Sequence, residues 1–369
     1  MPEVLIAGYY GFGNTGDEAI LASTVTALRR LAPELRLTVL SADPATTQKN
    51  HRVRALPRLD LARVAIAMSR SDLFLFGGGS LLQDTTSLRS LLYYLALLNM
   101  ALAAKKPVMV YANGFGPVSS RMGRRACRWT LDRVDLITLR DEDSRRELES
   151  LGIARPPVRV TADPAFLLEA ASPETVDNIL VREGICRPQV GRLVVAVRYW
   201  NGLDPGALAG ALDRLVQNTG LQVLFVPMHG EDDRRCSRET AALMSQPALV
   251  LKGSYAPSEL LGLIGTAHVL LGMRFHALVF AVSQAVPAAG IVYDPKVSAL
   301  LSTLGLPVAG HAGELDPVQL ATTVEQLYRC REACRGQLVT LAGDLRRDAA
   351  VGVRQALDLL GATKEKGAP

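Results

Sequence analysis

Short apolar runs alternate with longer segments of mixed polarity along this chain of 369 residues. The first run, Val4–Tyr9, is followed by Asp17–Leu31, where apolar residues recur at roughly helical spacing. A short apolar run predicts a buried strand, and a longer periodic segment predicts a helix. Further strands are predicted at 35–41, 72–76, 108–112, 135–139 and 158–161. Because strands separated by helices are joined by right-handed crossovers, the pattern predicts a parallel sheet.

The same alternation begins again in the second half of the chain. Strands are predicted at 193–198, 223–227, 249–252, 268–272 and 288–293, and helices at 205–218, from Pro257 onward and at 275–283. The segment 168–191, with its prolines and charges, is the expected linker. We therefore predict an α/β protein with two Rossmann-type, doubly wound domains facing a central cleft. The expected domains are 1–172 and 173–345, followed by a C-terminal helix and tail at 346–369.

Composition and charge narrow the class of protein. The chain is 49% hydrophobic and 21% charged, as in folded globular proteins. Its net charge is +5, and arginines gather at 121–133 (Arg121, Arg124, Arg125, Arg128 and Arg133). This cluster fits a solvated helix face, an anionic ligand or an anionic membrane surface. No nucleic-acid-binding module accompanies the charge, so we expect no nucleic-acid partner.

Cysteine usage and the apolar segments bear on location. The five cysteines are odd in number and widely spaced, which favours neither a disulfide framework nor a zinc site. The N-terminal sequence does not resemble a signal peptide, so a cytoplasmic location is expected. The apolar segment Leu91–Ala104 is short for a membrane span. It predicts a buried helix, with a membrane-facing helix as the alternative.

In parallel α/β sheets, ligands bind beyond the carboxyl ends of the strands, so the loops that follow the strands are the candidate site. The first loop contains Asn14, Asp17 and Glu18 among glycines that fit neither a dinucleotide fingerprint nor a P-loop. It is either a turn with a helix cap or a sugar-binding loop. The glycine run that includes Gly78 and Gly79 follows the third strand. It is either a tight turn or a place where backbone approaches a ligand closely.

Cationic residues follow other strands. Arg140 comes directly after 135–139, where a guanidinium can bind a carboxylate or phosphate or join a surface ion-pair network. In the second half, Arg274 and His276 open a helix directly after a strand, and Lys296 lies on the next loop. A helix N-terminus with two or three cations is typical of an anion site. Histidine is also suited to proton transfer near neutral pH.

Six segments in this order resemble the motifs of polysaccharide pyruvyl transferases, most closely the bacterial cell-wall type. They read YYGFGNTGDEAIL at 9–21, FGGGSLLQD at 76–84, NGFGP at 113–117, TLRDEDS at 138–144, GMRFHALVFA at 272–281 and YDPKV at 293–297. The resemblance implies a GT-B-like fold. It also implies transfer of the enolpyruvyl unit of phosphoenolpyruvate to a sugar, with a cyclic pyruvate ketal and phosphate as products. In the cell-wall type the acceptor is an N-acetylmannosamine residue of a lipid-linked disaccharide, and the finished polymer anchors surface-layer proteins.

The resemblance also implies roles for residues. Arg140, Arg274 and His276 match phosphoenolpyruvate-binding and catalytic positions, and Lys296 matches a donor-site lysine. We expect His276 to act as the general acid and Asp17 or Glu18 as the base. The expected acceptor side is Asn14, Asp17, Glu18, Gly78 and Gly79. We expect no metal, because no metal-binding cluster is evident in the sequence, and no cofactor, because phosphoenolpyruvate is a co-substrate. Peripheral contact with the inner face of the cell membrane is a further expectation.

Two other functions are compatible with the same pattern. A glycosyltransferase of this architecture would take a nucleotide sugar as its donor. A non-catalytic sugar-binding or scaffold protein would need no proton donor, and so would not require the grouping of Arg140, Arg274, His276 and Lys296. Binding of phosphoenolpyruvate, compared with nucleotide sugars, separates these functions.

Overall fold

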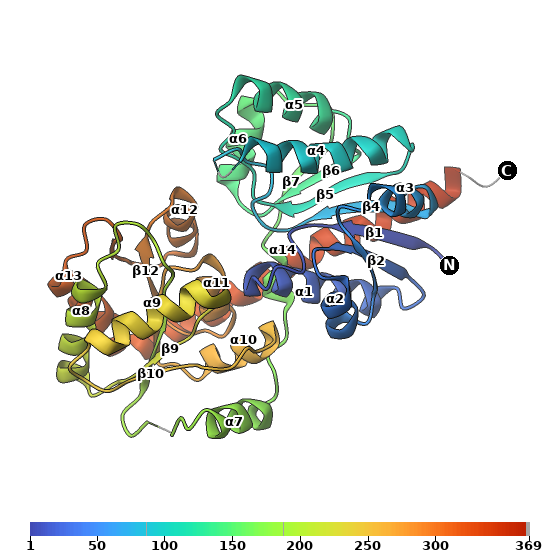
Figure 1. Ribbon diagram of the computed structural model, residues 1–369. Coiled ribbons are helices and arrows are strands. Elements are labelled where there is room, and N and C mark those ends of the chain that lie inside the picture. The colour runs from blue at the N-terminus through green and yellow to red at the C-terminus, as the bar shows by residue number, and fades with distance from the viewer. Residues whose placement is uncertain (86, 187, 367–369) are drawn as a thin grey trace. The chain divides into compact units, whose positions relative to one another are not determined.

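The computed structural model describes residues 1–85, 87–186 and 188–366 and confirms the α/β class (Figure 1). Its internal contacts divide the chain into two compact units. The first contains Met1–Gly13, Asp17–Leu168 and Leu345–Pro369, and the second contains Asn14–Gly16 and Glu169–Asp344. The C-terminal segment therefore belongs to the first unit, whereas the predicted first domain, 1–172, did not contain it.

The first unit is built on a parallel sheet in the order β3-β2-β1-β4-β5-β6-β7. Its strands are β1 (Glu3–Ala7), β2 (Arg36–Ser41), β3 (Arg54–Pro57), β4 (Leu73–Gly77), β5 (Val108–Asn113), β6 (Leu136–Leu139) and β7 (Val158–Val160). The central strands β1 and β4 are buried along their whole length, as continuous apolar runs in a doubly covered parallel sheet should be. The strand β3 was missed by the sequence analysis, because it is short and its first residue, Arg54, is exposed.

Helices cover both faces of this sheet. They are α1 (Thr15–Leu31), α2 (Pro44–His51), α3 (Leu61–Arg70), α4 (Leu88–Ala103), α5 (Arg121–Leu131), α6 (Glu142–Ser150), the 3₁₀ turn η1 (Pro164–Leu167) and the later part of α14 (Arg331–Lys366). One apolar core includes residues of α3, α4 and α5, and the other includes residues of α1 and α14. The helix predicted at Leu91–Ala104 is confirmed, with six buried residues in α4. Among the described residues, no helix combines the length and the hydropathy that are needed to span a bilayer.

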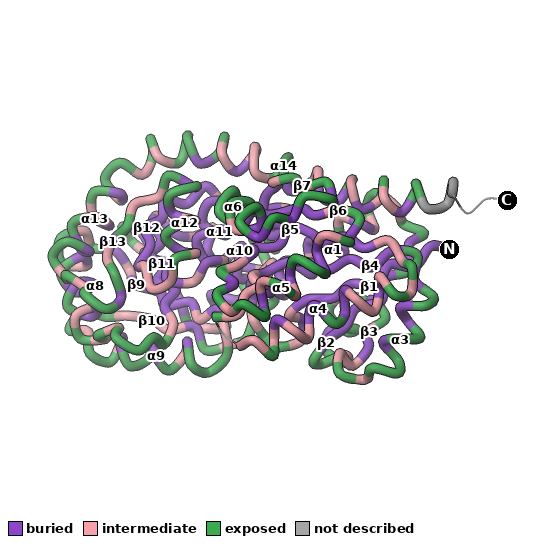
Figure 2. Tube along the Cα trace, turned by 90° about the horizontal axis from the view of Figure 1, so that it is seen from above, coloured by how far each residue is buried: buried purple, intermediate pink, exposed green. Residues whose placement is uncertain are grey.

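The second unit repeats the plan with a parallel sheet in the order β10-β9-β8-β11-β12-β13. Its strands are β8 (Arg192–Ala196), β9 (Gln222–Phe225), β10 (Ala248–Val250), β11 (Val269–Gly272), β12 (Ala288–Val292) and β13 (Val308–His311). Its helices are α7 (Pro173–Arg182), α8 (Pro205–Thr219), α9 (Gly230–Leu243), α10 (Pro257–Gly265), α11 (Phe275–Ser283), α12 (Pro295–Leu304), α13 (Pro317–Arg329) and the first part of α14. In Figure 2 the strands of both sheets are mostly purple, and exposed green segments lie on the helices outside them.

The expected linker is partly wrong, since residues 168–191 contain the helix α7. Ser172 caps this helix by accepting from the backbone N–H of Thr175, and Pro173 occupies the first helical position. Both are ordinary helix-start signals. The helix packs against α10 within the second unit, and its buried residues are Val176, Ile179 and Leu180.

Each sheet has one point where the strand order reverses. In the first unit this point lies between β1 and β4, and in the second between β8 and β11. Ligands of doubly wound sheets bind outside the carboxyl ends of the strands at such a point. The loops that follow these four strands are therefore the parts of the fold where a site is expected.

Candidate active site

The carboxylate of Glu18 fixes the glycine-rich loop after β1. One oxygen accepts from the backbone N–H of Gly11 at 2.7 Å, and the other lies 3.4 Å from Nε2 of His51. The side chain of His51 is only 8% exposed where it lies against Glu18. The structure therefore commits Glu18 to holding the loop.

Asp17 lies against the glycine run after β4. Gly78 and Gly79 both have positive φ, at 63° and 73°, which glycine adopts without strain. A β-carbon on Gly78 would lie 2.2 Å from the side chain of Ile20, and one on Gly79 would lie 2.7 Å from Oδ1 of Asp17. The buried carboxylate of Asp17 thus lies beside backbone that no larger residue could replace, at the switch point of the first sheet.

An aromatic cluster on the same rim was missed by the sequence analysis. The rings of Tyr9 and Phe12 are stacked with centroids 4.0 Å apart, and the guanidinium of Arg58 lies 5.1 Å from the Phe12 centroid and 4.4 Å from that of Tyr93. Phe12 remains 38% exposed, although it is a large apolar side chain. The motif YYGF at 9–12 already indicated aromatic side chains in this loop, but only its glycine was used in the prediction. Aromatic rings with a few polar groups are typical linings of small-molecule sites.

Arg140 is held at the ends of the next strands. Its Nη2 donates to Oγ of Ser80 at 2.8 Å, and its guanidinium lies 3.3 Å from Asp141 and 3.6 Å from Asp163. The side chain is 5% exposed. A β-carbon on Gly114 would lie 2.7 Å from Nη2, so the loop after β5 also shapes its position. Arg140 is therefore a buried, oriented cation whose charge is shared with two carboxylates.

The segment Asn14–Gly16 groups with the second unit, apart from Asp17 and Glu18. Oδ1 of Asn14 accepts from the backbone N–H of Gly16 at 3.2 Å. A β-carbon on Gly16 would lie 2.0 Å from Nδ1 of His276. The structure thus brings Asn14 into the unit that carries the candidate general acid.

In the second unit, Arg274 forms a two-point ion pair with Asp233 of α9. Nε donates to Oδ2 at 2.9 Å, and Nη2 donates to Oδ1. Asp233 is fully buried and also accepts from the backbone N–H groups of Met228 and His229. A bidentate carboxylate fixes the plane of a guanidinium. Asp233 therefore orients Arg274, a role that sequence reasoning missed because the two residues lie far apart in the chain.

His276 and Lys296 lie at two neighbouring helix starts. His276 is the second residue of α11, which follows β11, and Lys296 is the second residue of α12, which follows β12. Nζ of Lys296 lies 3.6 Å from Oδ2 of Asp294, the cap of α12, and the lysine side chain is 40% exposed. Because β11 and β12 are adjacent, both helix starts are at the same edge of the sheet.

Arg198 is a fourth cationic or proton-donating residue at this edge, and the sequence analysis did not select it. Its Nη1 donates to the hydroxyl of Tyr293 at 3.1 Å, and its guanidinium lies over the rings of Tyr293 and Trp200. The predicted strand ran through Arg198, whereas β8 ends at Ala196. Since the carbonyl of Ala196 accepts from the backbone N–H of Met273, the loop with Arg198 starts beside the loop with Arg274.

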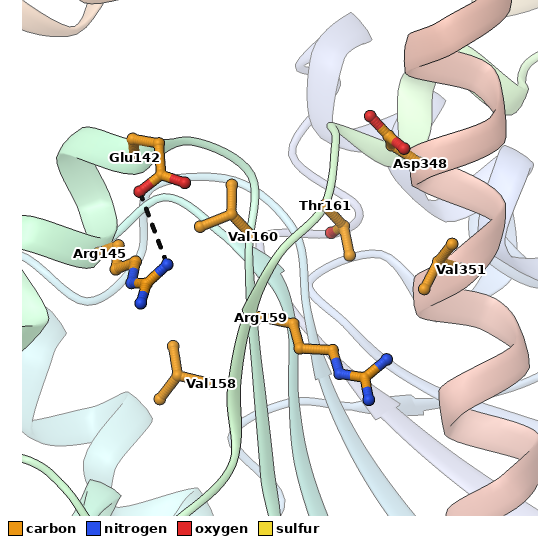
Figure 3. Close-up of a pocket in the computed structure, with 8 residues that line it drawn as sticks. All are labelled: Glu142, Arg145, Val158, Arg159, Val160, Thr161, Asp348 and Val351. Atoms are coloured by element: carbon orange, nitrogen blue, oxygen red, sulfur yellow. Dashed lines mark ion pairs between the residues drawn. The ribbon is translucent and has the colours of Figure 1, made fainter.

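The described residues hold no group of three or more histidine, cysteine or acidic side chains placed to bind a metal ion. A cavity of about 370 Å³ lies in the first unit, between α6, β7 and α14 (Figure 3). Its charged lining residues are Glu142, Arg145, Arg159 and Asp348, and the first two form an ion pair. The two positive and two negative side chains balance, and none of the predicted site residues lines this cavity.

Comparison with known proteins places these features in a family. The model of the polysaccharide pyruvyl transferase family matches residues 14–295. The amylovoran biosynthesis protein AmsJ of Erwinia amylovora is 22% identical, with 83% of this chain and 86% of AmsJ covered. The solved UDP-GlcNAc 2-epimerase of Neisseria meningitidis, bound to UDP-GlcNAc, has a TM-score of 0.67 at 14% identity, with 97% of this chain and 99% of that chain covered. A glycosyltransferase of Rickettsia africae has a TM-score of 0.65 at 9% identity, with 100% and 99% covered. Both structures show the same GT-B-like fold.

Proposed function

This chain belongs to the polysaccharide pyruvyl transferase family, and from that premise we propose that it transfers the enolpyruvyl unit of phosphoenolpyruvate to a sugar. The products are a cyclic pyruvate ketal and phosphate. The observation that carries the proposal is the gathering of Arg198, Arg274, His276 and Lys296 at the carboxyl ends of β8, β11 and β12. A small donor with a carboxylate and a phosphate needs several cations and a helix N-terminus.

The reaction needs a proton at one carbon and two new bonds at its neighbour. The methylene carbon of the donor gains a proton and becomes a methyl group. The adjacent carbon then bonds two hydroxyl oxygens of the sugar and loses its phosphate. Of the two hydroxyl protons, one restores the general acid and the other leaves on the phosphate. We assign His276 as the acid, because it opens α11 at the edge where the cations lie.

We assign Asp17, in preference to Glu18, as the base that accepts a hydroxyl proton. The carboxylate of Asp17 lies beside Gly79 at the switch point of the first sheet. The carboxylate of Glu18 lies against Gly11 and His51 and holds the loop after β1. A general base must lie within hydrogen-bond reach of the proton it takes, and the rim beside Gly79 is where backbone can approach a ligand.

We place the sugar acceptor on the first unit. Phe12 and Tyr9 offer stacked aromatic faces beside Asp17, and the apolar C–H face of a pyranose packs well on such rings. The name of the relative AmsJ refers to biosynthesis of a polysaccharide, amylovoran, which supports a saccharide acceptor. The resemblance to the cell-wall type narrows our proposal to N-acetylmannosamine of a lipid-linked precursor, modified in the cytoplasm and destined to anchor surface-layer proteins.

Donor binding tests the proposed function directly. Phosphoenolpyruvate should raise the melting temperature of the protein, because a ligand that binds only the folded state stabilises it. UDP-, GDP- and CDP-sugars should not. With a lipid-linked or soluble N-acetylmannosamine acceptor, phosphate should be released in proportion to the ketal formed. A shift with a nucleotide sugar alone would instead identify a glycosyltransferase, and binding without turnover on an authentic acceptor would identify a sugar-binding protein.

Replacing Arg198 with glutamine is expected to raise the KM for phosphoenolpyruvate about 10- to 100-fold, since a charged hydrogen bond contributes roughly 1.5–3 kcal/mol. Glutamine keeps some of the packing against Trp200 and Tyr293 and removes the charge. Steady-state kinetics at varied donor concentration measures the change. Arg214→Gln, on the exposed face of α8, is the matched control and should leave KM unchanged. Equal KM values for the two variants would remove Arg198 from the donor site.

A further inference from the structure

The helix α5 has one buried face and one exposed face of unusual composition. Its buried residues, Gly123, Cys127, Thr130 and Leu131, anchor it to the first unit. The exposed face and the second residue beyond the helix together carry Arg121, Met122, Arg125, Arg128, Trp129 and Arg133, which we call the α5 surface. Met122 is 55% exposed and Trp129 is 60% exposed. Helical spacing therefore collects four arginines and two large apolar side chains on one side.

Most of this positive charge is not balanced locally. Within the described part of the chain, Arg121, Arg125 and Arg128 form no ion pair, whereas Arg124, which lies outside the surface, pairs with Glu147. The nearest carboxylate along the chain, Asp132, accepts from the backbone N–H groups of Ala154 and Arg155 and pairs with the guanidinium of Arg155. These hydrogen bonds lower its pKa most, and the charge of Arg128 adds to the effect, so Asp132 offsets only part of the positive charge. The guanidinium of Arg133 lies 4.4 Å from the ring of Trp129, so charge and aromatic surface are adjacent.

We propose that the α5 surface docks on a bilayer that contains anionic phospholipids. Guanidinium groups bind phosphate through paired hydrogen bonds. Tryptophan prefers the headgroup region of a membrane, where its ring is apolar and its N–H is hydrated, and Met122 adds apolar area beside it. A nucleic-acid backbone would satisfy the arginines but leave Met122 and Trp129 uncovered. The mixed surface therefore favours a lipid interface.

The start of α5 is tied to the rim where we place the acceptor. The carboxylate of Asp84, in the loop that follows the glycine run after β4, accepts from the backbone N–H groups of Ser119 and Ser120, each at 2.8 Å. Ser120 is the cap of α5. A bilayer that holds α5 is thus only one short loop from the glycine run beside Asp17. The docking on the bilayer does not depend on the proposed function. Its purpose does rest on that function, because a lipid-linked acceptor would lie in the same bilayer.

The test uses the full chain and vesicles of phosphatidylcholine with or without phosphatidylglycerol. Co-sedimentation should require phosphatidylglycerol and weaken with salt. The variant R121Q/R125Q/R128Q should bind on the order of a hundredfold more weakly, from about 1 kcal/mol for each arginine near an anionic surface. The control R63Q/R70Q/R214Q removes the same charge from exposed helix positions elsewhere and should bind like the parent chain. Equal loss in both variants would show that net charge alone acts, and would overturn the proposal.

Tryptophan fluorescence is a second measurement, and attraction between charges alone would not change it. The chain has two tryptophans, so in a Trp200→Phe variant all tryptophan emission comes from Trp129. Anionic vesicles should shift this emission to the blue, and a synthetic duplex oligonucleotide should not. Binding to the oligonucleotide without binding to vesicles would overturn the proposal. With a water-soluble acceptor, R121Q/R125Q/R128Q should be as active as the parent chain. If the parent chain binds anionic vesicles but transfers no pyruvyl group to an acceptor, the proposed function is wrong and the docking proposal stands.

Discussion

Replacing His276 with alanine is expected to lower kcat by about 10²–10⁴-fold, which is the usual contribution of a positioned general acid. The donor can still bind to Arg198, Arg274 and Lys296 in this variant, so the affinity for phosphoenolpyruvate should change much less than kcat. Phosphate release in the presence of acceptor measures the first effect, and calorimetric titration of phosphoenolpyruvate measures the second.

Two further variants interpret that result. His311→Ala removes an exposed histidine of β13 and should leave both quantities unchanged. His276→Gln keeps a polar side chain of similar reach but cannot donate a proton as an acid, so it should be nearly as slow as His276→Ala. Near-normal turnover in either His276 variant would reject the assignment. A loss of binding as large as the loss of turnover would make His276 a donor ligand instead of the acid.

The second large effect concerns the pair formed by Arg274 and Asp233. Asp233 is fully buried, and Arg274 is mostly buried, at 14% exposure. Asp233→Ala leaves an uncompensated charge in this environment and two backbone N–H groups without their acceptor. We expect a loss of about 3–5 kcal/mol in the free energy of unfolding, as found when one partner of a buried pair is removed. Chemical denaturation followed by far-ultraviolet circular dichroism measures it.

A surface pair provides the matched control. Arg145 and Glu149 form an ion pair on α6 in which the arginine is 46% and the glutamate 59% exposed. Glu149→Ala should cost no more than about 1 kcal/mol, as is typical of exposed pairs. If Asp233→Ala is no more destabilising than Glu149→Ala, the Arg274 pair is not the internal support described above.

A double variant of Asp233 and Arg274 distinguishes a role in stability from a role in donor binding. In the double variant Asp233→Leu/Arg274→Met, both charges are absent, so much of the lost stability should return, as it often does when apolar residues replace a buried pair. Donor affinity should not return, because the guanidinium is gone. Recovery of both properties would mean that Arg274 has a structural role only.

The sequence was sufficient to predict most of the fold, and the exceptions have local physical causes. Continuous apolar runs located β1, β4 and β8 because parallel strands covered on both faces must be apolar along their length. The strand β13 was missed because it is short, and its ends, Val308 and His311, are exposed. The helix α9 was missed because it is strongly polar, with acidic residues throughout its first turn.

Site residues could be predicted where their position after a strand identifies them. They could not be predicted where they are identified only by a contact with a residue far away in the sequence. Arg140, Arg274 and Lys296 were found because each lies within a few residues of the end of a strand. Asp233 lies on α9 and Arg274 follows β11, so the two meet only in the folded chain, and no local sequence pattern reports such a contact. Arg198 was missed because the end of β8 was placed too late. The ends of strands are the least certain part of a prediction from sequence. Here the predicted end determines whether a residue is assigned to the strand or to the loop that follows it.

The return of α14 to the first unit has a consequence for synthesis of the chain on the ribosome. Val353, Ala356 and Leu360 complete the core beneath β1, β4 and β5, and a β-carbon on Gly352 would lie 2.9 Å from the ring of Tyr111. These residues are translated after the whole of the second sheet. Domains usually fold in the order of their translation. The sheet that is made first therefore keeps part of one face uncovered until α14 is translated, so the second sheet is the first to be completed.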